Sequence, residues 1–136
     1  MTQPLLSIGM IVKNEERCLE KCLKALEPLR QAIPCELVIA DTGSTDKTKE
    51  IASTYADILF DFEWVNDFSK ARNAVMDKCN GEWHLAVDAD EYLSSPISEI
   101  VEFLTGPLAK KNVHAAIIQR NFKSPNMSGE YFDFNA

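Results

Sequence analysis

Short apolar runs alternate with stretches of helical spacing along most of this chain, and that alternation constrains its fold more than any other feature. The apolar runs occupy residues 5–12, 36–41, 58–62, 83–87 and 113–119. Runs of this length predict strands buried on both faces, as in a parallel sheet. The intervening helical faces are Leu19, Cys22, Leu23, Leu26 and Leu29; Thr48, Ile51, Ala52 and Tyr55; Phe68, Ala71, Val75 and Cys79; and Ile97, Ile100, Val101 and Leu104. Strands that alternate with helices predict one α/β domain, with a mainly parallel sheet and helices on both faces.

Polar residues mark where the helices should begin. Asn14 is expected to cap the first helix, and Ser44 or Thr45 the second. Asp67 is expected to cap the third helix. Residues 123–136 show no clear period and are not assigned to any element.

The net charge and the cysteines limit which partners the chain is expected to bind and in which compartment it is expected to lie. The formal net charge of −7 gives no general attraction for nucleic acid or anionic lipid. No apolar run approaches the roughly 20 residues of a membrane-spanning helix, and the N-terminus lacks a signal-peptide pattern. The cysteines Cys18, Cys22, Cys35 and Cys79 lack the further ligands of a metal site and predict free thiols. We therefore expect a cytoplasmic chain, at the inner face of the membrane if a longer parent protein is anchored there.

Acidic residues follow three predicted strands, at the edge of the sheet where α/β proteins bind ligands. Residues 14–16 (Asn-Glu-Glu) follow the first strand, Asp41 the second, and residues 88–91 (Asp-Ala-Asp-Glu) the fourth. Two carboxylates that flank one small residue can hold Mg²⁺ or Mn²⁺, which in turn binds phosphate oxygens. The same tripeptide is common in solvated loops. The apolar strand directly before Asp88 favours the metal site, because it delivers both carboxylates to the binding edge.

Asp41 and the third helix suit a nucleotide. Asp41 can accept a hydrogen bond from the N–H of a base, and Lys70 and Arg72 add positive charge to a helix N-terminus, which favours a diphosphate. The alternatives are a simple turn at residues 41–46 and a solvated helix face. The sequence has no glycine-rich dinucleotide fingerprint, P-loop or nucleophile elbow.

Taken in order, four segments resemble the family 2 glycosyltransferases, inverting enzymes of the Rossmann-like GT-A fold. They are residues 7–15 (Ser-Ile-Gly-Met-Ile-Val-Lys-Asn-Glu), 41–46 (Asp-Thr-Gly-Ser-Thr-Asp), 67–73 (Asp-Phe-Ser-Lys-Ala-Arg-Asn) and 83–91 (Trp-His-Leu-Ala-Val-Asp-Ala-Asp-Glu). The third segment looks most like bacterial members that glucosylate lipopolysaccharide core, in cell-envelope polysaccharide biosynthesis, or that modify peptides.

The resemblance implies a role for each matching residue. Ile11, Val12 and Glu15 would line the nucleoside pocket, Asp41 would hydrogen-bond uracil, and Arg72 would reach the base or the phosphates. Asp88 would contact the ribose and assist the metal, Asp90 would ligate it, and Ala89 lies between them in the same motif. The implied donor is a UDP-sugar with Mn²⁺ or Mg²⁺. The implied acceptor is a glycan, a lipid-linked sugar or a peptide, whose nucleophile attacks the anomeric carbon with inversion.

The catalytic base is the part of the family pattern that this chain does not supply. An inverting transfer needs a base within hydrogen-bond reach of the nucleophile, and in this family it lies on a segment expected beyond Ala136. Glu91 is the only nearby carboxylate and is a weak match. We therefore expect residues 1–136 to be the nucleotide-sugar-binding part of an incomplete GT-A domain whose acceptor part is absent. The alternatives are a non-catalytic module that binds UDP-sugar, and a nucleotidyltransferase, which would need a glycine-rich basic loop after the first strand.

Overall fold

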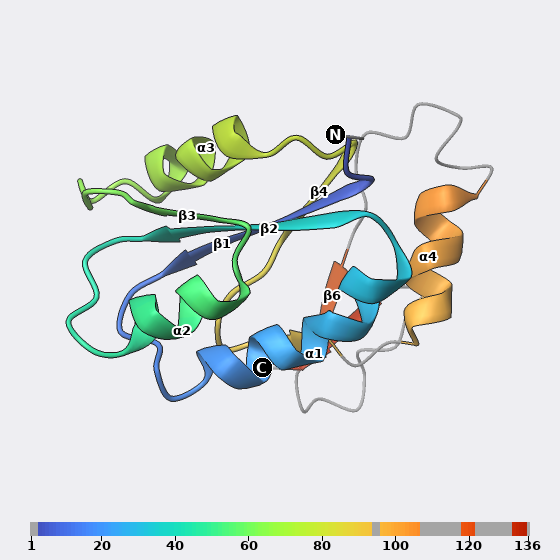
Figure 1. Ribbon diagram of the computed structural model, residues 1–136, viewed down its shortest axis with the longest axis horizontal. Helices are drawn as coiled ribbons and strands as arrows, with labels where there is room; N and C mark the ends of the chain where they lie inside the picture. Colours follow the sequence, from blue (N-terminus) through green and yellow to red (C-terminus); the bar gives the residue numbers. More distant parts are fainter. Residues whose placement is uncertain (1–2, 94–95, 107–117, 122–131, 136) are drawn as a thin grey trace.

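The computed structural model describes residues 3–93, 96–106, 118–121 and 132–135, and it confirms the predicted α/β fold. Strands and helices alternate from the N-terminus, with one short strand, β5, between β4 and α4 (Figure 1). The elements of this part are β1 (Leu6–Val12), α1 (Leu19–Ala32), β2 (Cys35–Asp41), α2 (Thr48–Tyr55), β3 (Ile58–Asp61), α3 (Phe68–Lys78), β4 (Trp83–Ala86), β5 (Tyr92–Leu93) and α4 (Ile97–Thr105).

The main sheet is parallel, with the strand order β3-β2-β1-β4. Residues from Leu6 to Val12 pair in register with residues from Cys35 to Asp41. In the same way Asp41 pairs with Asp61 on β3, while Gly9 pairs with Ala86 on β4. All four strands therefore end on one side of the sheet, here called the carboxyl edge, which is where α/β sheets bind ligands.

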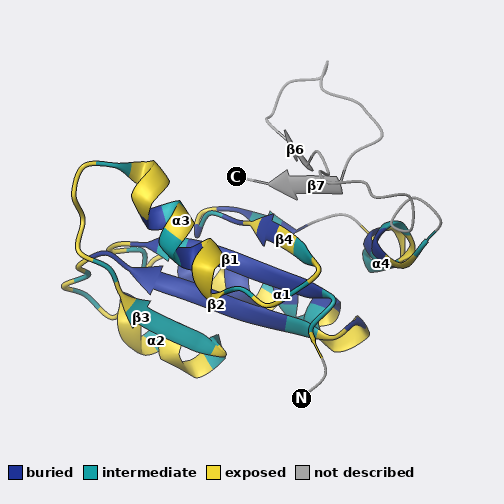
Figure 2. Ribbon diagram, turned by 90° about the horizontal axis from the view of Figure 1, so that it is seen from above, coloured by how far each residue is buried: buried dark blue, intermediate teal, exposed yellow. Residues whose placement is uncertain are grey.

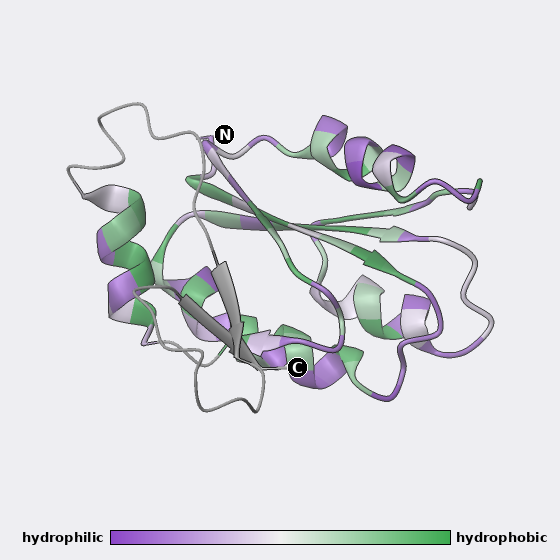
Figure 3. Cartoon of the chain, turned by 180° about the vertical axis from the view of Figure 1, so that it is seen from behind, coloured by the Kyte–Doolittle hydropathy of each residue, from purple (hydrophilic) through white to green (hydrophobic). Residues whose placement is uncertain are grey.

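Helices cover both faces of the sheet, as predicted. Figure 1 shows α1 and α2 on one face and α3 on the other. Alternation along β1 sends Ile8, Met10 and Val12 into the large core beneath α1, whereas Ile11 packs with Val75 of α3 in a smaller cluster. Figure 2 shows β1 and β2 buried through the centre, and Figure 3 shows hydrophobic residues concentrated in the same strands. These two strands are the rigid base of the carboxyl edge.

A second, three-stranded sheet has the order β5-β7-β6, in which β6 is Ile118–Asn121 and β7 is Phe132–Asn135. β6 runs parallel to β7, and β5 runs antiparallel to it. The strand predicted at 113–119 overlaps β6 only at its end, and residues 113–117 lie outside the described part. Where it is described, this strand pairs with β7 and not with the main sheet. β7 falls in the stretch that the sequence left unassigned.

The structure confirms one predicted helix cap and overturns two. Asp67 caps α3, because its Oδ1 accepts a hydrogen bond from the Ser69 backbone at 3.0 Å. Asn14 does not cap α1, which begins after Cys18 without a side-chain cap. At α2, neither Ser44 nor Thr45 acts as the cap, and the Asp46 carboxylate accepts the Thr48 N–H instead. Asn14 and Ser44 instead bond to each other and join the loops after β1 and β2.

All four cysteines are free thiols, as predicted. Within the described ranges, no helix has the length and apolar character needed to cross a bilayer.

Candidate functional site at the carboxyl edge

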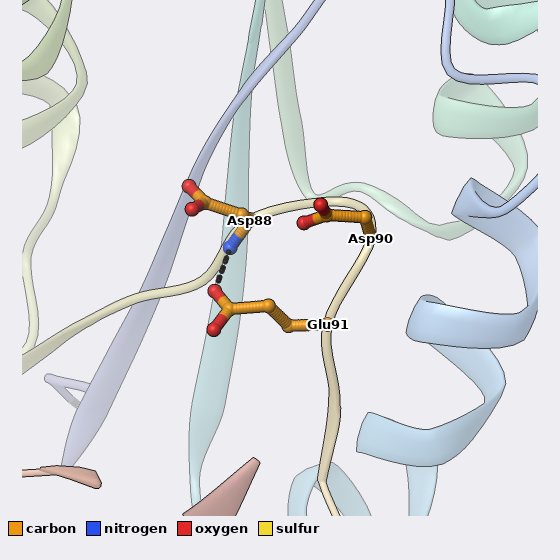
Figure 4. Close-up of side chains that lie close together, drawn as sticks. All are labelled: Asp88, Asp90 and Glu91. Atoms are coloured by element: carbon orange, nitrogen blue, oxygen red, sulfur yellow. Dashed lines mark hydrogen bonds between the residues drawn. The ribbon is translucent and has the colours of Figure 1, made fainter. Parts of the chain in front are cut away.

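Three acidic side chains cluster where the chain turns after β4. Asp90 is exposed, Asp88 half-buried and Glu91 buried, and one carboxylate oxygen of each lies within 4.8 Å of the others. Figure 4 shows the Asp90 carboxylate directed toward Asp88, while the Glu91 side chain folds back onto the Asp88 backbone. The Asp88 N–H donates to Glu91 Oε1 at 3.0 Å. The carboxylates of the two aspartates could therefore hold a metal ion, and Glu91 holds the turn from within.

Helix α1 supports this turn from below. The Cys22 thiol donates a weak hydrogen bond to the Asp88 carbonyl at 3.6 Å, and Lys21 Nζ lies 4.4 Å from the centre of the Tyr92 ring. Burial, followed by the nearby Cys18 thiol and the acidic cluster, raises the pKa of Cys22 to about 12. The thiol stays protonated and remains a donor at neutral pH. Ala89 is buried in the core (3% exposed), so its side chain anchors the motif and does not face a ligand.

Asp41 ends β2 with one carboxylate oxygen engaged and the other without a partner. Oδ1 accepts the Gly43 and Ser44 backbone N–H groups at 2.9 and 2.8 Å. Oδ2 is buried and has no hydrogen-bond partner among the described residues. Burial raises the pKa of Asp41, but the hydrogen bonds from Ser44 and Gly43 outweigh it and lower the pKa below its usual value. A buried, charged acceptor without a partner among the described residues thus lies at the carboxyl edge.

The loops after β1 and β2 are locked together. The Asn14 N–H donates to Ser44 Oγ at 2.9 Å, and Asn14 Oδ1 accepts the Thr45 N–H at 2.8 Å. Asn14 has a φ of 51°, a left-handed conformation that asparagine tolerates better than most residues. The Glu15 N–H donates to Thr48 Oγ1 at 2.7 Å, so Glu15 is held beside the loop that carries Asp41. Asn14 therefore bridges the two loops, whereas α1 begins only at Leu19.

One small pocket, with a volume of about 10 Å³, brings together three predicted residues, Ile11, Arg72 and Asp88. They come from β1, α3 and the turn after β4. The turn lies beside β1 because β4 pairs with that strand. The rest of the lining is Gly9, Met10, Val75, His84, Ala86 and Val87. Val12 does not line it, because its side chain is in the core (1% exposed), and its carbonyl accepts the Thr42 N–H. Any contact of Val12 with a nucleotide would therefore be limited to its backbone.

His84 is a pocket residue that the sequence reasoning missed. Alternation along β4 gives the signal: Leu85 is buried, so His84 and Ala86 lie on the opposite face, toward α3. Partial burial and then the charge of Arg72 lower the pKa of His84. The imidazole is therefore mainly neutral at physiological pH.

The fold and this acidic edge define the class of protein. A model of the family described as Glycosyl transferase family 2 matches residues 7–128. The chain belongs to this family and is a glycosyltransferase sequence, as the resemblance predicted.

Relatives of this chain carry glycosyltransferase names. The SPbeta prophage-derived glycosyltransferase SunS of Bacillus subtilis (strain 168) is 31% identical over 111 residues, covering 75% of this chain and 25% of SunS. The lipopolysaccharide core biosynthesis glycosyltransferase LpsC of Rhizobium meliloti (strain 1021) is 33% identical over 100 residues, covering 71% of this chain and 35% of LpsC. The chain thus spans about a quarter to a third of the length of these two relatives.

Solved glycosyltransferase structures share the fold. TarS of S. aureus (residues 1–349) superposes with a TM-score of 0.65 at 22% identity, covering 91% of this chain and 37% of TarS. Glucosyl-3-phosphoglycerate synthase of Mycobacterium tuberculosis, solved with Mn²⁺ and UDP, superposes with a TM-score of 0.57 at 22% identity, covering 76% of this chain and 41% of the synthase. These similarities confirm the GT-A fold.

Proposed function

We propose that this chain binds a nucleotide-sugar donor, a UDP-sugar, together with Mg²⁺ or Mn²⁺, as the donor-binding part of an inverting glycosyltransferase. The observation that carries the proposal is the placement of Asp88. Its carboxylate belongs to the acidic cluster with Asp90, and it also lines the pocket that contains Arg72. A cation-binding cluster and a positively charged side chain therefore adjoin at one point of the carboxyl edge. A diphosphate requires both kinds of neighbour.

The side chains present fit a hard divalent cation. Asp88 and Asp90 would hold it through carboxylate oxygens, the ligand type that Mg²⁺ and Mn²⁺ prefer. When bound, such a cation neutralises charge on the departing diphosphate. In this proposal Arg72 contributes a second positive charge toward the phosphates or the base.

Asp41 suits the base of the nucleotide. The free Oδ2 is a charged acceptor, and a buried acceptor without a partner is energetically unfavourable by about 1–3 kcal/mol. The N–H of a uracil ring would supply the missing hydrogen bond. Because Oδ2 is shielded from solvent, a base would reach it only by displacing the atoms that cover it. Ile11, near the end of β1, and Glu15, on the loop after β1, would contact the nucleoside.

Glu91 is better suited to positioning than to acting as the catalytic base. Its carboxylate is buried and already accepts the Asp88 N–H, whereas a base needs an open approach to the nucleophile. We therefore propose that the base and the site for the acceptor, whether a glycan, a lipid-linked sugar or a peptide, lie in sequence beyond this chain. The cytoplasmic location stays a prediction from the sequence.

Calorimetry with UDP and Mn²⁺ tests the donor site. We expect the chain to bind UDP in the presence of Mn²⁺, with affinity reduced at least about tenfold by Asp90→Asn. The matched control is Asp77→Asn, an exposed acidic residue on α3 outside the cluster. If UDP binds equally well without metal, or if Asp90→Asn has no effect, the metal assignment is wrong.

A non-catalytic module that holds UDP-sugar is the second candidate, favoured by the engagement of Glu91. Incubating this chain with a UDP-sugar and Mn²⁺ and measuring released UDP separates the two candidates. We expect binding with little release from this chain, and transfer from the parent protein. Absence of transfer from the parent protein would favour the module.

A further inference from the structure

Two aromatic side chains beside the pocket stay exposed, although large hydrophobic residues are ordinarily buried. Trp64 is 37% exposed and Phe68 is 55% exposed. Trp64 lies in the connection between β3 and α3, and Phe68 is the first residue of α3. Their rings meet edge to face, with centroids 5.5 Å apart and an interplanar angle of 82°, a favourable geometry for an aromatic pair. The pair is ordered by a specific contact without being part of the core.

Phe68 also contacts Arg72, one turn along the helix. The Arg72 guanidinium carbon lies 5.7 Å from the centre of the Phe68 ring, within the range of a cation–π interaction. Residues four apart share one helix face, and on this face Val75 is buried against the sheet. Arg72 therefore contacts the exposed ring and lines the pocket beside Asp88 at the same time.

The aromatic pair has its own support. Trp64 Nε1 donates to Asn66 Oδ1 at 3.1 Å. Asn66 has a φ of 57°, which lets the chain turn sharply into the capping residue Asp67. The indole is thus fixed relative to the first turn of α3, where Phe68 lies.

We propose that Phe68, backed by Trp64, is a positioning residue that holds the Arg72 guanidinium at the pocket. An arginine side chain in water samples many rotamers, and a ring beneath the guanidinium reduces that freedom before any ligand arrives. The role of this device in donor binding rests on the proposed function. The placement of Arg72 by Phe68 does not rest on the proposed function, and it can be measured without a nucleotide.

His84 reports the placement of Arg72 directly. A Cβ added at Gly9 would lie 2.7 Å from both His84 Cε1 and Val75 Cγ1, so the imidazole packs closely over β1 beneath α3. Partial burial is the larger cause of its lowered pKa, and the charge of Arg72 is the second. If Arg72 leaves the pocket, its charge no longer lowers the pKa of His84, while the effect of burial remains, so the pKa should rise.

The test is an NMR titration of the His84 ring in this chain, with His114→Gln in every variant so that one imidazole is observed. Arg72→Gln should raise the pKa of His84. Phe68→Leu, which keeps an apolar side chain without a ring, should produce most of that rise. Phe68→Tyr, which keeps the ring, and Met76→Leu, an exposed control on the same helix, should leave the pKa unchanged. The inference is overturned if Arg72→Gln raises the pKa and Phe68→Leu does not, or if neither does.

A second measurement addresses the donor. With Mn²⁺ present, Phe68→Leu should weaken UDP binding by about two- to fivefold, the range of an exposed cation–π contact, and Phe68→Tyr should restore it. Unchanged affinity together with a raised His84 pKa would overturn the role in donor binding. If the unmodified chain fails to bind UDP, the proposed function fails, while the His84 titration still decides whether Phe68 places Arg72.

Discussion

The buried carboxylate of Glu91 accepts the backbone N–H of Asp88 at 3.0 Å, closing the turn that carries the Asp-x-Asp motif. Glu91 is 6% exposed, and its side chain folds back onto the Asp88 backbone, whereas the carboxylate of the exposed Asp90 is directed toward Asp88 (Figure 4). Where a side chain orients metal ligands in this way, its loss typically lowers metal affinity or activity by about 10- to 100-fold. In the proposed metal site, Asp88 and Asp90 would thus be the ligands and Glu91 an internal brace.

Changing Glu91 separates bracing from base catalysis. Glu91→Gln keeps an oxygen acceptor, so Mn²⁺-dependent UDP affinity should stay within about threefold of the original, whereas Glu91→Ala should weaken it at least about tenfold. Calorimetry measures both. A catalytic base would give a different pattern: both variants would bind UDP normally, and Glu91→Gln in the parent protein would abolish transfer.

Replacing Asp41 tests the contact with the base. Asp41→Asn keeps Oδ1 for the Gly43 and Ser44 N–H groups but replaces the free Oδ2 by an NH₂ donor, which repels an imide N–H. UDP affinity should fall about tenfold or more, as expected for a lost hydrogen bond to a charged group. The control is Asp61→Asn, because Asp61 pairs in register with Asp41 yet is exposed and bonded to Lys49. Equal affinities in the two variants would rule out Asp41 as the acceptor.

Glu36 should make the fold sensitive to acid. Burial raises the pKa of this carboxylate, but hydrogen bonds from Ser7 and Asn80 outweigh it and lower the pKa. A carboxylate with a lowered folded-state pKa stabilises the fold above its unfolded pKa of about 4.3 and loses that contribution as pH falls through the folded value. Urea unfolding between about pH 5 and pH 3 should therefore show a smaller loss of stability in Glu36→Gln than in the unmodified chain. Parallel curves of stability against pH for the two proteins would refute this role. Asp41, whose pKa is also lowered, should make the stability of both proteins depend on pH to some extent.

Two glycines on the α3 side of the sheet should differ in their tolerance of alanine. A Cβ at Gly81 would lie 2.6 Å from the Ser7 backbone nitrogen, whereas a Cβ at Gly9 would meet only the side chains of His84 and Val75, at 2.7 Å. Side chains can rotate away more easily than backbone can move. Gly81→Ala should therefore destabilise by more than the roughly 1–3 kcal/mol typical of an overpacked core, and Gly9→Ala by about that amount. Thermal unfolding of the two variants measures the difference, and the reverse order would show that β1 yields more readily than His84.

The same pair of variants gives a second observation. Because Gly9 lines the pocket, its alanine variant should weaken UDP binding even where the protein stays folded. Gly81 does not line that pocket, so the folded fraction of Gly81→Ala should bind UDP with its original affinity.

Much of the fold follows from local sequence. Continuous apolar runs specify buried strands, helical spacing specifies the helices between them, and Asp67 caps α3 because an aspartate beside a free N–H forms that bond with no distant help. The strand ending just before Asp88 likewise places the acidic motif at the carboxyl edge. Each of these signals involves residues close together in the sequence, so local sequence patterns are enough to predict it.

The tertiary structure decides which distant residues meet. The pairing of β4 with β1 brings Asp88 beside Ile11 and Arg72, and it makes His84 a pocket residue. No local sequence pattern specifies which strand pairs with β4. Asn14 resembled a cap, but α1 begins only at Leu19, and Asn14 bonds Ser44 and Thr45 of the loop after β2 instead. The sequence by itself determined the strands of the main sheet and the helices between them, but not β5 or β7, and it placed the acidic residues at the carboxyl edge. Only the three-dimensional arrangement decided which oxygens face outward and which are used inside, because burial and long-range hydrogen bonds depend on what packs alongside.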